Sequence, residues 1–120
     1  MTPEGKVKVR VKAIIKSYKP HVYSHWPVLN GMGEPTLDCN GSVGGVAFSV
    51  ETKKEGAGLT MRQMRTKADM ENGGVTVFVI VGRDDLALAE FDAWLRERVI
   101  RWLDKLERGG GSPWPKQCET

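Results

Sequence analysis

The chain has 120 residues, a formal net charge of +3, and an ordinary mixture of 40% hydrophobic and 28% charged residues. This composition predicts one globular domain and excludes wholesale disorder. No apolar run approaches the roughly 18 residues that a spanning helix needs, so we expect no membrane partner. The charged start lacks the hydrophobic segment of a secretory signal, which predicts a cytoplasmic protein. Two cysteines, Cys39 and Cys118, are too few for a disulfide-stapled scaffold or a cysteine-rich zinc module.

Positive charge is concentrated in two segments of the chain. Residues 1–19 hold six Lys or Arg side chains against one acid, and residues 53–67 hold five against one. Segregated basic charge suits a polyanion such as DNA, because neutralised phosphates release their counterions. Two solvated, lysine-rich helix faces explain the same pattern equally well, so charge alone leaves both interpretations open.

The first predicted element is a helix over residues 2–19. Thr2 is a favourable cap, and Pro3 is tolerated at the first helical position. Residues 6–12 alternate valine with basic side chains, as a strand does, but their valines also continue one helix face. The start signals and the length favour the helix, and this choice leaves Val9 exposed.

Three strands are predicted in succession after this helix. We expect them over residues 21–29, 36–40 and 46–53, because each is rich in β-branched or aromatic residues or follows a loop containing Gly and Pro. The segment 30–35 reads as a loop, and the glycines of residues 41–45 predict a turn between the last two strands.

The second half of the chain predicts a helix, a strand and a long helix. Thr60 and Gln63 fit a capping box, which opens a helix that ends near Asn72. Residues 75–81 form an almost wholly apolar run, typical of a central strand buried on both faces. The pattern of residues 84–107 predicts a long helix whose apolar stripe is either a lid on the sheet or a dimer contact.

The resulting order of elements is α-β-β-β-α-β-α, which predicts an α/β fold with one mixed sheet and helices on its faces. We expect residues 1–107 to form this single domain. Residues 108–120, which begin with glycines, are expected to form a flexible C-terminal tail.

One group of residues has the composition of a metal-dependent hydrolytic site. Glu51 and Lys53 project from the same face of a strand, and Asp38 lies on the strand before it. If the two strands are adjacent, the carboxylates and the Thr52 carbonyl supply the oxygen ligands that Mg²⁺ or Mn²⁺ prefers. Lys53 would then hold the attacking water or stabilise developing charge during phosphodiester hydrolysis. An ordinary ion pair at a strand end is the simpler alternative.

Four stretches of sequence carry a resemblance to a nuclease family, at residues 33–38, 50–53, 59–63 and 72–75. Over about residues 2–81 the chain resembles the VRR-NUC family of the PD-(D/E)XK nuclease superfamily, whose small single-domain members are often phage-encoded. The resemblance implies an αβββαβ restriction-endonuclease-like core with a mixed four-stranded sheet, to which the long C-terminal helix is an addition. It also implies metal-dependent cleavage of DNA by a homodimer that acts on branched substrates such as four-way junctions, in the cytoplasm of a bacterial host if the chain is phage-encoded.

The resemblance assigns roles residue by residue. Asp38 and Glu51 match the acidic metal ligands, Lys53 the catalytic lysine, Gln63 a glutamine beside the site, and Glu4 an acid near the metal. Gln63 has capping as an alternative role, and Glu4 has the helix dipole as its alternative. The expected phosphate contacts are Lys8, Lys12, Lys54, Arg62, Arg65 and Lys67.

The leading hypothesis is therefore a divalent-metal-dependent endodeoxyribonuclease. A non-catalytic DNA-binding module on a nuclease-like fold is the first alternative. A protein-interaction adaptor that works through its C-terminal helix is the second. Fold alone does not decide among these three functions.

Overall fold

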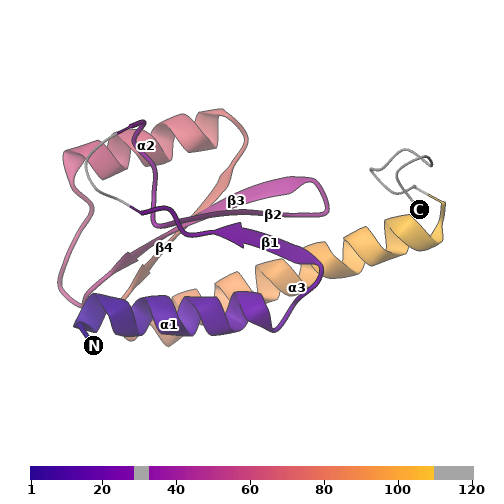
Figure 1. Cartoon of the computed structure of the whole chain (residues 1–120), viewed down its shortest axis with the longest axis horizontal. Helices are drawn as coiled ribbons and strands as arrows, with labels where there is room; N and C mark the ends of the chain where they lie inside the picture. The colour runs from indigo at the N-terminus through magenta and orange to yellow at the C-terminus, as the bar shows by residue number, and fades with distance from the viewer. Residues whose placement is uncertain (29–32, 110–120) are drawn as a thin grey trace.

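The computed structural model describes residues 1–28 and 33–109. Its elements are α1 (Pro3–Lys16), β1 (Val22–His25), β2 (Cys39–Val43), β3 (Val46–Lys53), α2 (Met61–Asn72), β4 (Thr76–Val81) and α3 (Asp85–Glu107) (Figure 1). This order confirms the predicted α/β class and its arrangement of strands and helices. Beyond Gly109 the predicted tail lies outside the described residues, as does part of the predicted loop at 30–35.

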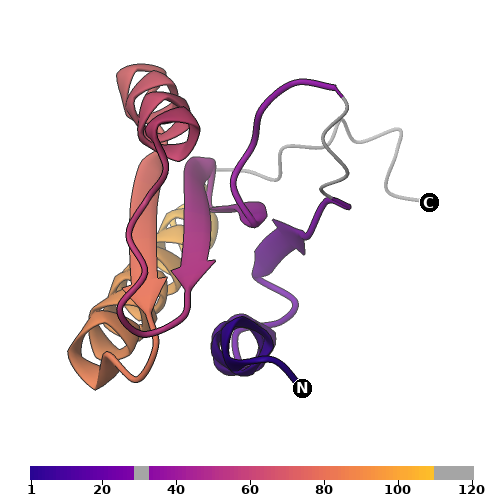
Figure 2. The same cartoon turned by 90° about the vertical axis from the view of Figure 1, so that its left-hand side faces the viewer.

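The four strands form one mixed sheet in the order β1-β2-β3-β4. The pairs β1/β2 and β2/β3 are antiparallel, whereas β3 and β4 are parallel. Parallel neighbours need a crossover connection, and α2 supplies it. Helix α2 lies over one face of the sheet, and α1 and α3 pack together on the other (Figures 1 and 2).

Helix α1 confirms the choice of helix over strand for the alternating basic segment. The side chain of Thr2 accepts a hydrogen bond from the Gly5 amide at 3.0 Å and so caps the helix. The buried side chains repeat every four residues, at Val7, Val11 and Ile15. Val9 is 50% exposed, as expected. The helix ends at Lys16 rather than 19, because the chain turns before the Lys19–Pro20 bond.

The strand predicted over 36–40 is wrong in its bounds, because β2 runs from Cys39 to Val43 and includes a glycine assigned to the turn. A Cβ at Gly41 would lie 2.5 Å from the Phe48 ring and closer still to the Tyr23 carbonyl oxygen. Glycine is therefore required in the strand by close packing. The turn itself is only Gly44 and Gly45, both with positive φ, which is the two-residue hairpin geometry.

Replacement of Gly41 by alanine should lower the free energy of unfolding by at least about 2 kcal/mol, because the neighbouring backbone and ring must move apart. Urea denaturation of the two proteins measures this difference. Gly58→Ala is the matched control, since a Cβ there meets nothing within 4 Å and its φ is not positive. Equal losses in the two variants would contradict the packing explanation.

Two other strand predictions need correction. The apolar strand β4 is an edge strand, not a central one, and most of its residues are only half-buried. Its apolar character comes from α2 and α3, which contact it from opposite faces while its outer edge stays open. The strand expected over 21–29 is shorter, because β1 ends at His25.

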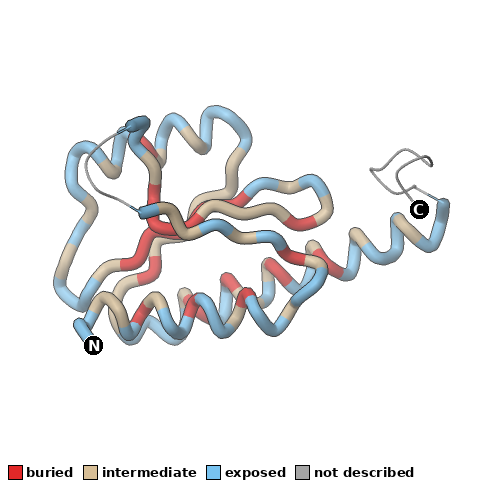
Figure 3. The backbone as a smooth tube through the Cα atoms, in the orientation of Figure 1, coloured by how far each residue is buried: buried red, intermediate tan, exposed pale blue. Residues whose placement is uncertain are grey.

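The buried residues of the long helix α3 all lie between Leu88 and Val99. Phe91 and Leu95 are fully buried, and Val99 is 8% exposed. Beyond Val99 the helix is only half-buried or exposed (Figure 3). Leu103 is 40% exposed although it belongs to the same predicted stripe. The first half is thus a layer of the core. Among the described helices, none combines the length and apolar character needed to cross a bilayer.

Candidate functional site

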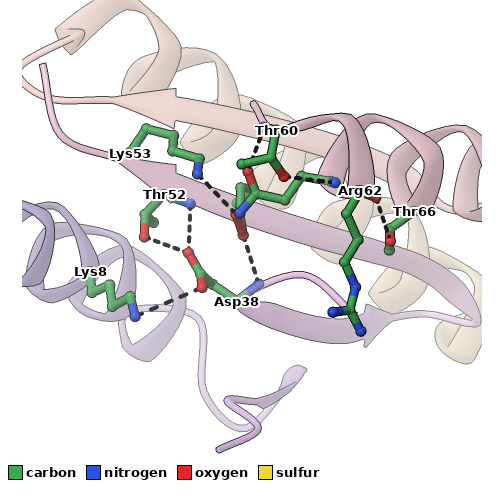
Figure 4. A network of polar contacts seen from close by, with 9 residues as sticks. Lys8, Asp38, Thr52, Lys53, Thr60, Arg62 and Thr66 are labelled. Atoms are coloured by element: carbon green, nitrogen blue, oxygen red, sulfur yellow. Dashed lines mark hydrogen bonds and ion pairs between the residues drawn. The ribbon is translucent and has the colours of Figure 1, made fainter. Parts of the chain in front are cut away.

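The carboxylate of Asp38 is held by the end of β3. Asp38 directly precedes β2, and its Oδ2 accepts hydrogen bonds from the Thr52 amide at 2.9 Å and the Thr52 hydroxyl at 2.7 Å (Figure 4). Asp38 is 7% exposed and Thr52 is fully buried. The sequence assigned Thr52 a role through its carbonyl alone. The structure adds that its amide and hydroxyl fix the Asp38 carboxylate.

Glu51 lies directly across from Asp38 and is even more deeply buried. Its Oε1 accepts a hydrogen bond from the Asp38 amide at 3.1 Å, and Glu51 is only 2% exposed. The antiparallel pairing of β2 with β3 brings the two acids together, because Cys39 pairs with Val50 and the next position joins Asp38 to Glu51. The predicted adjacency of the two acids is therefore present.

Gln63 connects this acid to the start of α2. Its side-chain oxygen accepts from the Thr60 amide at 3.0 Å, and the Thr60 hydroxyl accepts from the Gln63 amide at 3.1 Å, which completes the capping box. Its side-chain nitrogen donates to Oε2 of Glu51 at 2.8 Å. The sequence left open whether Gln63 caps α2 or lies beside the site. Its side chain does both, since the oxygen caps the helix and the nitrogen contacts Glu51.

Two lysines approach the carboxylates from opposite sides. Nζ of Lys53 lies 3.9 Å from Oε2 of Glu51, and only 12% of the Lys53 side chain is exposed. Nζ of Lys8 on α1 lies 3.8 Å from Oδ1 of Asp38. Lys8 was expected only as a phosphate contact. Its place in the site was not predictable, because it depends on how α1 packs across the sheet.

The surroundings of Asp38 and Glu51 make it unfavourable for both carboxylates to carry a negative charge. The pKa of Glu51 is raised from 4.5 to about 7, mainly by burial and then by the nearby Asp38 charge, whereas Lys53 acts in the opposite direction. Burial and the neighbouring acid therefore favour the neutral form of Glu51 in the folded protein.

The free energy of unfolding of the metal-free protein should fall as the pH rises from 4.5 to about 7. In this range the folded state keeps a proton on Glu51 that the unfolded chain has released, so stability present below pH 4.5 is lost as pH rises through the folded pKa. One such group changes stability by up to about 1.4 kcal/mol per pH unit. Urea denaturation in EDTA at about pH 5 and about pH 8 measures the decline. The variant Glu51→Gln cannot titrate at this position and should show a smaller decline; equal declines would exclude Glu51 as their source.

The oxygen atoms of the site fit a hard divalent cation. Within residues 1–28 and 33–109, no cluster of three or more His, Cys, Asp or Glu side chains offers a complete set of side-chain ligands. A metal here would be held by the carboxylates of Asp38 and Glu51 and by backbone or water oxygen. The N–H and C=O of one strand residue point toward the same neighbour, so the Thr52 carbonyl shares the side on which Asp38 lies.

The remaining predicted residues lie around this centre without joining its hydrogen bonds. Glu4 and Lys54 line a pocket of about 400 Å³ that Lys53 also lines, beside the first turn of α1. Arg62 and Arg65 are exposed on α2. The other two expected phosphate contacts have partners of their own: Lys67 lies 3.0 Å from Glu71, and Lys12 lies over the Trp26 ring.

Comparisons of the chain with protein-family models, with curated proteins and with solved structures find no match. The site must therefore be judged from its own geometry.

Proposed function

We propose that this protein is a divalent-metal-dependent endonuclease that hydrolyses DNA phosphodiester bonds on an αβββαβ nuclease core. One observation carries the proposal. Two buried carboxylates on neighbouring strands, Asp38 and Glu51, lie beside a nearly buried lysine, Lys53, that shares the strand face of Glu51. Burying paired acids is costly unless a cation compensates them. A site of this kind is better suited to metal-assisted hydrolysis than to stabilising the fold.

Each residue of the site has a part in this mechanism. Asp38 and Glu51, with the Thr52 carbonyl, would hold Mg²⁺ or Mn²⁺, which when bound supplies positive charge and lowers the pKa of a water. The Thr52 amide and hydroxyl fix the Asp38 carboxylate, and Gln63 fixes Glu51. Lys53 is placed to orient the attacking water or to stabilise the negative charge that develops on the phosphate.

Substrate and assembly belong to the same proposal. We propose branched DNA, such as a four-way junction, as the substrate and a homodimer as the active species, in the cytoplasm of a bacterial host. The resemblance noted above supports both. The exposed basic side chains of α1 and α2 on either side of the site support a grip on phosphates. The exposed apolar residues Ile100 and Leu103 of α3 offer a surface for a second copy.

The test compares cleavage of a labelled four-way junction and a matched linear duplex in Mg²⁺, Mn²⁺ or EDTA. We expect metal-dependent nicking of the junction that is lost in Asp38→Asn. Asparagine can still accept both hydrogen bonds from Thr52, so the variant should fold while losing one charged ligand. Equal cleavage of both substrates would remove the junction preference. No cleavage in either metal would refute the nuclease.

A non-catalytic DNA-binding module is the second candidate, and one observation favours it. Lys8 and Lys53 already provide each carboxylate with a cation at 3.8 and 3.9 Å. If these ion pairs are the final state of the site, Asp38→Asn should leave DNA affinity unchanged, and neither metal should support cleavage.

A further inference from the structure

One side of α1 continues the basic surface away from the carboxylates. Lys8, Lys12 and Lys16 follow one another at intervals of four residues, so they lie on the same side of the helix. Lys19 lies in the turn that follows. The row begins at the candidate site, because Lys8 contacts Asp38. At 1.5 Å per residue, Lys16 is about 12 Å further along the helix than Lys8.

The far part of this row surrounds a pocket of about 220 Å³ between α1 and β1. Its lining residues are Lys12, Ile15, Lys16, Lys19, Ser24 and Trp26. Nζ of Lys12 lies 4.8 Å from the centroid of the Trp26 ring, and this cation–π contact holds the ammonium at the pocket wall. None of these lining residues is acidic, and three of them are lysines.

The lysines of this pocket form no ion pair with the rest of the described chain. Within the described ranges, no carboxylate lies within ion-pair distance of Lys12, Lys16 or Lys19. By contrast, most arginines of α3 have an acidic partner on the same helix. Three lysines without an ion-pair partner among the described residues, together with a serine, line one small pocket, and this composition suits a phosphate-sized anion.

We propose that this pocket binds a backbone phosphate of the DNA strand whose reacting bond lies at Asp38 and Glu51. The inference rests on the proposed function, and it adds the direction in which the strand leaves the site, along α1. One strand of duplex DNA carries a phosphate about every 3.4 Å of axis. The separation of about 12 Å therefore places the bound phosphate about three to four positions from the reacting one.

The first test measures the salt dependence of duplex binding in EDTA, where no cleavage is required. Loss of the one pocket phosphate in Lys16→Ala/Lys19→Ala should reduce the slope of log K against log[KCl] by about 0.9. Between about 50 and about 200 mM KCl, wild type should then lose about 3.5-fold more affinity than the variant. The matched control, Lys105→Ala/Arg108→Ala, removes two exposed charges from the end of α3 and should keep the wild-type slope. An unchanged slope in the α1 variant overturns the proposal.

The second test locates the phosphate. Neutral methylphosphonates placed singly along the cleaved strand should weaken wild-type binding at about the third or fourth position from the cleaved bond, and have no effect there in the α1 variant. A separate experiment measures whether inorganic phosphate, as a free anion, stabilises the protein against unfolding. If it stabilises wild type but not the variant while the two DNA slopes agree, the pocket is a small-anion site and the proposal fails. If the protein cleaves DNA but wild type and the α1 variant have the same salt slope, this inference alone is refuted. If the slopes differ but no cleavage occurs, the nuclease alone is refuted. If the protein does not bind DNA, both are refuted.

Discussion

Substitution of Lys53 by methionine should lower the rate of metal-dependent DNA cleavage by about a hundredfold to a thousandfold. Methionine has a similar length and preserves packing at a side chain that is only 12% exposed, so the loss would come from the missing charge. Binding of Mg²⁺ should persist, because the carboxylate ligands remain and Lys53 no longer competes for Oε2 of Glu51. Single-turnover cleavage and the thermal shift caused by Mg²⁺ measure the two effects separately.

The neighbouring lysine supplies the control for this substitution. Lys54 is exposed, lines the same pocket as Lys53, and makes no ion pair among the described residues. Lys54→Met should therefore weaken DNA binding modestly and leave the single-turnover rate within about threefold of wild type. Similar losses of rate in both variants would indicate a general effect of charge, and would remove Lys53 from the reaction.

Substitution of Phe91 by alanine should have the largest effect on stability, a loss of about 3–5 kcal/mol in the free energy of unfolding. Phe91 is fully buried, and its ring centroid lies 5.0 Å from that of Phe78 and 5.8 Å from that of Phe48. The cavity would therefore open between α3 and two strands of the sheet. Urea denaturation measures the loss, which is a large share of the stability of an ordinary domain.

Leu103→Ala on the same helix is the comparison for this result. Leu103 belongs to the same apolar stripe but is 40% exposed, so its truncation should cost less than about 1 kcal/mol in an isolated chain. A loss as large as that of Phe91→Ala would mean that the outer half of α3 is covered in solution. The helix would then be both a layer of the core and a contact surface.

Local sequence signals predicted the helices better than they predicted the strands. The capping box of Thr60 and Gln63 predicted where α2 starts, because a cap is an interaction between residues three apart. Gly41 misled the assignment of β2, because this glycine is required by close contacts with Tyr23 and Phe48 that arise only when the strands pair. The position of β4 at the edge likewise depends on pairing across the sheet, which apolar composition does not encode.

Some residues of the candidate site could likewise be predicted from local patterns, whereas others depend on how the elements pack. Asp38, Glu51 and Lys53 were found because strand periodicity and a short hairpin bring them together. The interaction of Lys8 with Asp38 depends on the angle at which α1 crosses the sheet, and no local pattern specifies that angle. The assignment of metal and substrate stays a prediction, since the geometry supplies ligands and charges but no reaction.

The turn of Gly44 and Gly45 sets which residues of β2 and β3 lie opposite one another. It closes the hairpin on the pair Val43 and Val46, and every later pair follows from that closure until Asp38 meets Glu51. Side chains alternate between the faces of a strand, so a shift by one residue would turn Glu51 to the opposite face of the sheet. Insertion of one residue into the turn would then separate the two acids while leaving every residue of the site unchanged. The pairing of Asp38 with Glu51 therefore depends on the length of the hairpin turn as well as on the identity of the two residues.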